Sequence, residues 1–351
     1  MRTIVQSDQN GRRAVRVARQ LSARPWQAMR QAAICGLACL ALGATTTVGA
    51  QEADYPNKPV RVLIGAAAGG GLDYIARSFT DSLSKELGQP VIIDYRPGAA
   101  GLLAADAAAK AAPDGYTLWV ADVGPLAVHP ALYSNINYDA EKDFSYLGML
   151  AQIPLVLVTH PSVAANNLDE FTALAGKQPE MSYGSVGVGN GTHLTMELYK
   201  QRTHTQLRHV PYRGVAPAIT DVLGGHIETM FVDIKTAAPH IREGKLKALA
   251  LAAAERNPAL PDVLTFGEAG IEGFDVSPWV GLAAPAGLPE GVAARLRDAL
   301  AKVTQMPETA QRLADGGFIP LVGSAQRMEE LAVADRELWG GLIRERGIRV
   351  E

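Results

Sequence analysis

The stretch 63-LIGAAAGGGLDYIARSF-79 joins a short hydrophobic run, three successive glycines and a segment with helical periodicity. A strand, a glycine turn and a helix start are a common setting for an anion, because the first backbone N–H groups of a helix lack intrahelical partners. Gly69, Gly70 and Gly71 leave those groups unhindered. The spacing fits neither a Walker loop nor the dinucleotide-binding fingerprint. Two readings stay open: a nest that holds a carboxylate without any cation, and a simple tight turn between strand and helix.

Short hydrophobic runs alternate with helical stretches along the whole chain from Tyr55. The expected strands are 60–64, 91–95, 117–121, 153–160, 182–185, 207–210, 229–233, 246–252 and 276–284, and the expected helices are 72–87, 100–110, 168–177, 192–202, 215–223, 235–243, 289–305, 307–316 and 324–346. This alternation predicts an α/β fold with parallel sheets covered on both sides. The long apolar runs 153–160 and 276–284 are expected to cross between two lobes. Lobe 1 would then comprise 55–155 plus 280–351 and lobe 2 would comprise 156–279, with a solute in the cleft between them.

The first fifty residues differ in composition from the rest. Seven arginines, no lysine and one acid precede the end of the apolar run 32-AAICGLACLALGATTTVGA-50. A basic leader, a short apolar core and small residues before the cut predict a secretory signal peptide over residues 1–50, with Met29 as a possible true start. A membrane anchor is the alternative, but the run is short and rich in Gly, Ala and Thr. Both cysteines lie in this segment, so the mature chain would carry no thiol and no disulfide.

The remaining chain has an acidic, globular composition. Of 33 basic and 36 acidic residues in all, 26 and 35 follow Ala50, which gives a net charge of −9. With 20% charged and 48% hydrophobic residues the sequence is neither disordered nor suited to nucleic acid.

Three further segments place polar groups at strand ends or helix starts. In 94-DYRPGAAG-101 a strand leads into a glycine turn, where Arg96 either pairs with a ligand or ties loops together. In 187-GVGNGTHL-194, Asn190 or Thr192 can cap a second helix start. In 211-PYRGVAPAITDVLGGHIETMFVD-233, Arg213 and Asp233 follow strands, and open α/β sheets bind ligands at such ends. Two helix starts that face each other across a cleft would suit a ligand with two polar ends.

Signs of catalysis are weak. The segment 184-GSVG-187 lacks the glycine two residues before Ser185 that a nucleophile elbow requires. The seven histidines are scattered and show no metal-binding spacing. We therefore expect no catalytic residue, no metal and no cofactor.

A series of motifs in order resembles one family over residues 55–350. These are 55-YPNKPVRVLI, 69-GGGLDYIAR-77, 88-GQPVIIDYRPGAAG-101, 113-PDGYTL-118, 129-HPALY-133, 138-YDAEKDF-144, 191-GTHL-194, 209-HVPYRG-214, 224-GG-225, 239-PHIREGKLKALA-250, 260-LPDV-263 and 285-PAG-287. The chain resembles the periplasmic solute-binding receptors of tripartite tricarboxylate transporters, also called the Bug family.

The resemblance implies a two-lobe periplasmic-binding-protein fold of the Venus-flytrap kind, type II-like. The protein would be a periplasmic monomer that closes on a small organic anion, often a carboxylate, and delivers it to membrane permease subunits. A receptor that presents its ligand to a two-component sensor is an alternative, and a secreted hydrolase is a less favoured one. The residues expected to bind the ligand are Ala67, Gly70, Gly71, Leu72, Asp73, Gly98, Asp122, Gly124, Gly189, Thr192, His193, Arg213, Gly214 and Asp233.

The sequence departs from the family pattern at the expected site. Residues 65–73 read GAAAGGGLD where the family commonly has Pro-Phe-Ala-Pro-Gly-Gly-Ser-Thr-Asp, so an aromatic ring and two hydroxyls are missing. Asp122 stands where Ser or Thr is usual, and an unpaired buried carboxylate is costly. Asp122 or Asp233 would need Arg213, Lys235 or a ligand N–H as a partner. These departures argue against citrate and favour a carboxylate with an apolar or aromatic body, or one that bears nitrogen.

Overall fold

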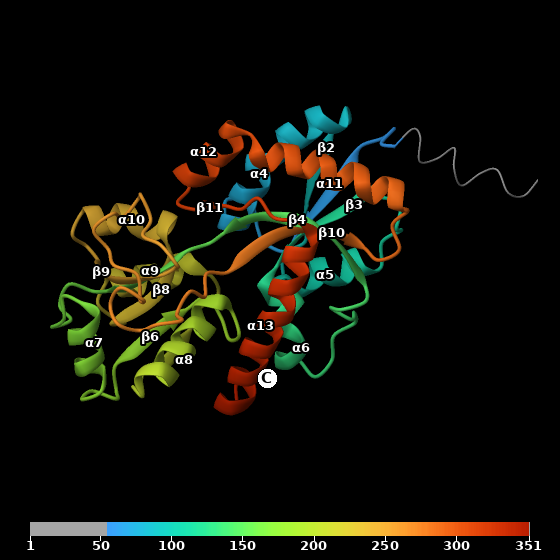
Figure 1. Cartoon of the computed structure of the whole chain (residues 1–351). Coiled ribbons are helices and arrows are strands. Elements are labelled where there is room, and N and C mark those ends of the chain that lie inside the picture. Colours follow the sequence, from blue (N-terminus) through green and yellow to red (C-terminus); the bar gives the residue numbers. More distant parts are fainter. Residues whose placement is uncertain (1–54, 351) are drawn as a thin grey trace, which may run out of the picture. The chain divides into compact units, whose positions relative to one another are not determined.

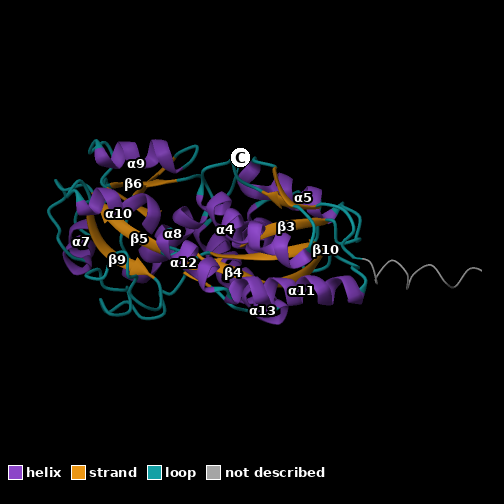
Figure 2. Cartoon of the chain, turned by 90° about the horizontal axis from the view of Figure 1, so that it is seen from above, coloured by secondary structure: helices purple, strands orange, loops and turns teal. Residues whose placement is uncertain are grey.

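The structure is a computed structural model in which residues 55–350 are described (Figure 1). The predicted signal peptide lies outside these residues. The unit Pro56–Glu351 contains two β-sheets, each with its own set of helices (Figures 1 and 2).

The first sheet has six strands in the order β11-β4-β10-β3-β1-β2. They are β1 (Val60–Ile64), β2 (Val91–Tyr95), β3 (Thr117–Asp122), β4 (Phe144–Gln152), β10 (Trp279–Pro285) and β11 (Ile319–Pro320). Strand β1 pairs in parallel with β2 and β3, as predicted, but β10 runs antiparallel to both β3 and β4. The expectation of wholly parallel sheets is therefore wrong. Strand β10 enters the sheet from the side at which β3 ends, because the chain returns there from the second sheet.

The second sheet has five strands in the order β7-β6-β8-β5-β9. They are β5 (Leu155–Thr159), β6 (Ser182–Ser185), β7 (Arg208–Pro211), β8 (Thr229–Asp233) and β9 (Lys247–Ala252). Strand β6 is parallel to β7 and β8, whereas β5 is antiparallel to β8 and β9. Strand β5 likewise starts at the edge where the parallel strands end, since it comes directly from the first sheet.

The helices follow the predicted periodicity closely. They are α4 (Gly71–Leu87), α5 (Leu102–Ala109), α6 (His129–Leu132), α7 (Leu168–Ala175), α8 (Gly191–Thr203), α9 (Val215–Leu223), α10 (Ile234–Arg242), α11 (Glu290–Gln305), α12 (Pro307–Asp315) and α13 (Ala325–Arg346), with a 3-10 turn η1 (Ala99–Gly101) and a π-helical turn η2 (Gly124–Val128). The prediction missed β4, β11, η2 and α6. The sequence of β4, 144-FSYLGMLAQ-152, carries a glycine and no clean alternation, and η2 and α6 each contain a proline.

The chain passes between the sheets at two places. It leaves the first sheet after Gln152 and enters the second at Leu155, and it returns between Ala252 and Trp279. The two passages lie side by side, because Ile153 N donates a hydrogen bond of 2.7 Å to Pro278 O. The two apolar runs are thus mostly strands within one sheet each, and short segments beside them make the crossing. The exact lobe limits stay a prediction.

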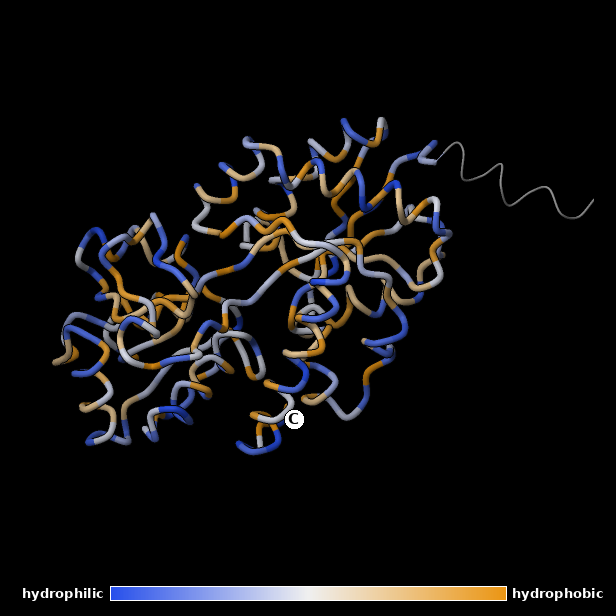
Figure 3. Tube along the Cα trace, viewed as in Figure 1, coloured by the Kyte–Doolittle hydropathy of each residue, from blue (hydrophilic) through white to orange (hydrophobic). Residues whose placement is uncertain are grey.

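Hydrophobic side chains fill the space between sheets and helices. Every residue of β5 and β10 is buried, and Trp119, Phe79 and Phe231 are at most 1% exposed. Figure 3 shows that hydrophobic stretches recur along the trace among hydrophilic ones. Burial of such side chains contributes roughly 1.5–3 kcal/mol each, so both sheets form rigid platforms from which their edge loops project.

Candidate functional site

A cavity of about 670 Å³ lies where strands of both sheets end. The first sheet supplies the loop after β1, the turn before α5, the end of β3 and the start of β10. The second sheet supplies the loops before α8 and α9 and the end of β8. The lining residues are Gly65 to Leu72, Ala100, Gly101, Asp122 to Gly124, Val128, His129, Ile153, Leu155, Val186, Gly189 to Thr192, Arg213 to Pro217, Val232, Asp233, Pro278, Trp279 and Phe318.

The glycine loop after β1 forms one wall of this cavity. Gly70 caps α4 with an extended backbone and provides no side chain to its first turn. The N–H groups of that turn therefore depend on solvent or a ligand, and the helix dipole favours an anion there. Gly69 has φ +87°, which residues with side chains rarely adopt.

Asp73 holds this loop in place and does not line the cavity. Its carboxylate accepts hydrogen bonds from Gly69 N at 2.7 Å, Tyr95 OH at 2.6 Å and Arg77 Nε at 2.9 Å. Burial raises the pKa of Asp73, but these hydrogen bonds and the Arg77 charge outweigh it and hold the pKa below its usual range. These hydrogen bonds hold the glycine loop in position, and a direct contact between Asp73 and the ligand stays a prediction.

The turn before α5 contributes Ala100 and Gly101 to the wall rather than the expected Gly98. Ala100 has φ 53° and Gly101 has φ 92°, so the chain makes a left-handed turn there. Gly65 lies so close to this turn that a Cβ on it would come within 2.6 Å of Gly101 Cα. Arg96 pairs with Asp94 at 3.0 Å, in agreement with the loop-tying alternative.

Backbone N–H groups of the loop before α8 are hydrogen-bonded to polar side chains of the same loop and helix start. Asn190 caps α8 through a hydrogen bond from Thr192 N at 3.1 Å, and Val186 N donates to Thr192 Oγ1 at 3.1 Å. Gly189 N donates to Nδ1 of His193 at 3.0 Å. Gly189 and Thr192 line the cavity as expected, but these backbone amides are already engaged within the protein.

His193 does not line the cavity. It stacks on His209 with ring centroids 3.9 Å apart, and burial lowers its pKa to about 3. The ring is therefore neutral at physiological pH and packed within the protein, and its expected role in ligand binding stays a prediction.

The start of α9 is the open helix end on the second sheet. Gly214 caps it with φ +115° and offers no side-chain cap. Arg213 precedes it and has neither a hydrogen bond nor an ion pair to any other residue of the described chain. A free guanidinium beside an uncapped helix start is well suited to a carboxylate. The two open ends are thus those of α4 and α9, not α4 and α8 as the sequence suggested.

The two strand-end carboxylates behave differently. Asp233 caps α10: Thr236 N donates to its Oδ1 at 2.9 Å and Thr236 Oγ1 donates to its Oδ2 at 2.8 Å. Asp122 accepts one hydrogen bond, from Gly124 N at 2.8 Å. Burial raises the pKa of Asp122 to about 6, and that hydrogen bond lowers it only in part.

Sequence reasoning missed the aromatic and apolar part of the wall, in particular Trp279, Phe318 and Val186. Trp279 is the first residue of β10, so its place beside the predicted crossing between the sheets could have indicated that it lines the site. Phe318 comes from the turn after α12 and was not recognisable from any pattern. Their presence adds apolar surface to the cavity wall, and Phe318 lies beside Gly71 at the start of α4, where a Cβ would be 3.5 Å from its ring.

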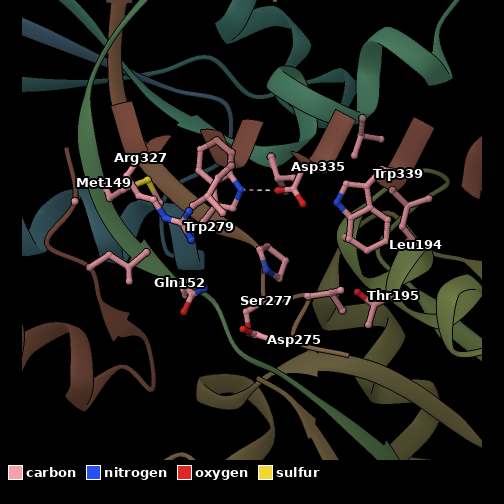
Figure 4. A pocket seen from close by; sticks show the side chains of 18 of the residues that line it. Met149, Gln152, Leu194, Thr195, Asp275, Ser277, Trp279, Arg327, Asp335 and Trp339 are labelled. Carbon is pink, nitrogen blue, oxygen red and sulfur yellow. Dashed lines mark hydrogen bonds between the residues drawn. The ribbon is translucent and has the colours of Figure 1, made fainter. Parts of the chain in front are cut away.

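A smaller cavity of about 260 Å³ lies behind Trp279, between α8 and α13 (Figure 4). Trp279 Nε1 donates a hydrogen bond of 2.6 Å to Oδ2 of Asp335 there. This cavity shares Val123, Val128, Gly191, Pro278 and Trp279 with the larger one, but it receives the open end of neither α4 nor α9. We therefore take the larger cavity as the candidate binding site.

Within residues 55–350 no cluster of three His, Cys, Asp or Glu side chains is arranged to hold a metal ion. None of the helices in the same range has the length and hydrophobicity needed to cross a bilayer.

Two α/β sheets joined by paired crossings, with a cavity at their strand ends, define the class of two-lobe periplasmic binding proteins. Residues 75–348 match the TctC family, the receptors of the tripartite tricarboxylate transporter family, and the chain belongs to this family. It is 32% identical over 324 residues to Protein BugT of Bordetella pertussis, which covers 92% of this chain and 99% of that protein. The predicted family and two-lobe fold are thus confirmed.

Solved structures agree with this assignment. One described as a periplasmic transporter is 36% identical, with a TM-score of 0.77 over 85% of this chain and all of that one. An R. palustris protein with adipate is 29% identical, with a TM-score of 0.77 over 85% of this chain and 100% of that one. MatC from Rhodopseudomonas palustris with bound malate is 32% identical, with a TM-score of 0.73 over 82% of this chain and 100% of that one.

Proposed function

We propose that this chain is a periplasmic receptor that binds a small organic carboxylate in the larger cavity and delivers it to the permease of a tripartite transporter. The observation that carries this proposal is the pair of uncapped helix starts, α4 and α9, which border one cavity from two different sheets. The family membership supports it, as do the adipate and malate in two similar structures.

The binding step uses no chemical reaction. A carboxylate would accept hydrogen bonds from the first turn of α4 on one sheet and from Arg213 and the first turn of α9 on the other. Because such a ligand touches both sheets, it stabilises the arrangement in which they are close together. The permease would recognise that arrangement.

Isothermal titration with mono-, di- and tricarboxylates tests the binding step. Arg213→Ala should lower the affinity for the tightest-binding carboxylate about 10- to 100-fold, since a charge-assisted hydrogen bond contributes roughly 1.5–3 kcal/mol. Gly70→Leu should also weaken it, because Gly70 has an extended backbone that accepts any side chain while the added atoms enter the cavity. Arg208→Ala is the matched control, since Arg208 is exposed on β7 and lies outside the cavity. Unchanged affinity in both site variants would show that the site is elsewhere.

Delivery requires a cellular test. Deletion of this chain in its source cells should abolish uptake of the identified carboxylate and leave the transcription of other genes unchanged. Retained uptake with a lost transcriptional response would instead favour the sensor alternative.

A further inference from the structure

Two groups of opposite charge face the larger cavity without an oppositely charged partner in the described chain. Asp122 lies at the end of β3 in the first sheet, and Arg213 follows β7 in the second. Neither forms an ion pair within the described chain, and the two are more than 4.0 Å apart, because no ion pair joins them under that limit. Two separated charges of opposite sign on the wall of one cavity can be matched by a ligand that carries both signs of charge.

The carboxylate of Asp122 is open on the cavity side. Its Oδ1 accepts the hydrogen bond from Gly124 N, and its Oδ2 lies 4.0 Å from the place where a Cβ on Gly101 would stand. No donor within residues 55–350 reaches Oδ2, yet this atom is not among those sealed away from the surface. The missing donor therefore has to come from solvent or from a bound solute.

The neighbouring side chains do not supply a positive charge. His129 also lines the cavity, but burial lowers its pKa to about 4, so its ring is neutral at pH 7. Tyr138 faces the same region and donates its hydroxyl hydrogen to Pro125 O at 2.9 Å. The Lys235 ammonium lies 3.8 Å from the ring centre of Tyr74, and Lys235 is not part of the cavity wall.

We propose that the preferred solute is zwitterionic, with a protonated amine that binds Asp122 and a carboxylate that binds Arg213 and the open helix ends. This rests on the proposed function and deepens it. An ammonium N–H supplies the donor that Oδ2 lacks and neutralises a charge that is costly to keep buried alone. The same cavity wall includes the aromatic rings of Trp279 and Phe318, which can contact a hydrocarbon body of the solute.

A different solute would use Asp122 in its protonated form, as a hydrogen-bond donor to a second carboxylate. The two cases respond to pH in opposite directions. An amine prefers the ionised Asp122, so its affinity rises as pH increases from 5 to 8, whereas a dicarboxylate would then bind more weakly.

The test is titration calorimetry on the full mature protein with matched pairs of probes. Each pair is an amino acid and its des-amino analogue: aspartate and succinate, glutamate and glutarate, leucine and 4-methylpentanoate, phenylalanine and 3-phenylpropanoate. At pH 8 the amino acid of at least one pair should bind at least 10-fold more tightly than its analogue. Asp122→Asn should reduce that ratio to below 3-fold, while Asp81→Asn, a change on the exposed face of α4, should leave it unchanged.

The outcomes separate this inference from the proposed function. If des-amino carboxylates bind as tightly as amino acids in every pair, or if Asp122→Asn keeps the preference, the zwitterion is ruled out while the carboxylate receptor stands. If no carboxylate of either kind binds and Arg213→Ala has no effect, the proposed function fails and this inference fails with it.

Discussion

Trp279 at the start of β10 and Asp335 on α13 are joined by a hydrogen bond of 2.6 Å from the indole Nε1 to Oδ2 (Figure 4). Trp279 is also part of the wall of the larger cavity, so this hydrogen bond holds part of the wall of the candidate site in place. Burial raises the pKa of Asp335, and the hydrogen bonds from the indoles of Trp279 and Trp339 partly offset that rise. The carboxylate thus orients Trp279 beside the crossing between the sheets.

Replacement of this carboxylate should loosen the binding surface. In Asp335→Ala the indole N–H of Trp279 loses its partner, which costs roughly 1–3 kcal/mol. We expect a lower midpoint of urea unfolding, altered tryptophan fluorescence and a several-fold weaker solute affinity. Glu337→Ala, an exposed change on the same helix, is the control. An unchanged fluorescence spectrum and affinity would show that Asp335 does not position Trp279.

Asp122→Asn should make the empty protein more stable at neutral pH. The pKa of this carboxyl is about 6 in the folded protein and its usual value is 3.8, so the folded state binds more protons between these values. Stability therefore falls as pH rises through that window, by up to about 3 kcal/mol. The amide removes this loss and can still accept the hydrogen bond from Gly124 N. The difference in unfolding free energy between variant and parent should be large at pH 7.5 and near zero at pH 3.5; a pH-independent difference would contradict the burial of a carboxylate.

Gly189 allows the two sheets to approach each other at one rim of the cavity. A Cβ at this position would lie 2.0 Å from Leu132 Cδ2, and the backbone has φ +72°. Gly189→Ala should therefore weaken solute binding at least 10-fold, since it opposes the close arrangement.

The steric and backbone effects of that change can be separated. Gly244→Ala carries the same backbone penalty, since Gly244 has φ +67° and no atom within 4 Å of its Cβ position. This variant should lose roughly 1 kcal/mol of stability and keep its affinity. The double change Gly189→Ala with Leu132→Ala should recover most of the binding. If it does not, contact between the sheets is not what limits affinity.

The sequence predicted most elements because their hydrophobic periods are regular, but it could not predict the direction of β10 or the existence of β4. Direction depends on where the chain re-enters a sheet, and β4 is held by its partner strands rather than by its own pattern. Both the presence and the limits of α4, α8 and α9 were visible in the sequence.

The site was predicted less well, for a reason that lies in helix capping. Asn190 was recognisable as a cap for α8, and a capped helix start has fewer free N–H groups to offer a ligand. Gly214 could have indicated that α9 is the open end instead. The Asp73 carboxylate accepts hydrogen bonds from Gly69 N and from the hydroxyl of Tyr95. Because Tyr95 is distant in sequence, no local pattern indicated this arrangement.

A buried charge cluster links α8 to α13, and its residues do not line the larger cavity. Glu197 accepts hydrogen bonds from Lys200 Nζ at 2.5 Å, Tyr183 OH at 2.6 Å and Arg346 Nε at 3.0 Å. Burial raises the pKa of Glu197, but these partners together lower it below its usual value. The cluster therefore stabilises the fold above about pH 4.5, and that contribution is lost as pH falls through the lowered pKa.

Glu197→Gln should cost roughly 3–5 kcal/mol, because it leaves the Lys200 ammonium, 8% exposed, without its carboxylate. The double variant Glu197→Gln with Lys200→Met should be markedly less destabilised, since no unpaired buried charge remains. Arg346→Met should cost under about 1 kcal/mol, because this guanidinium is 27% exposed and its partner keeps Lys200. Urea unfolding at pH 7 measures all three, and a cost for the double variant equal to that of Glu197→Gln alone would mean that the loss comes from packing rather than charge.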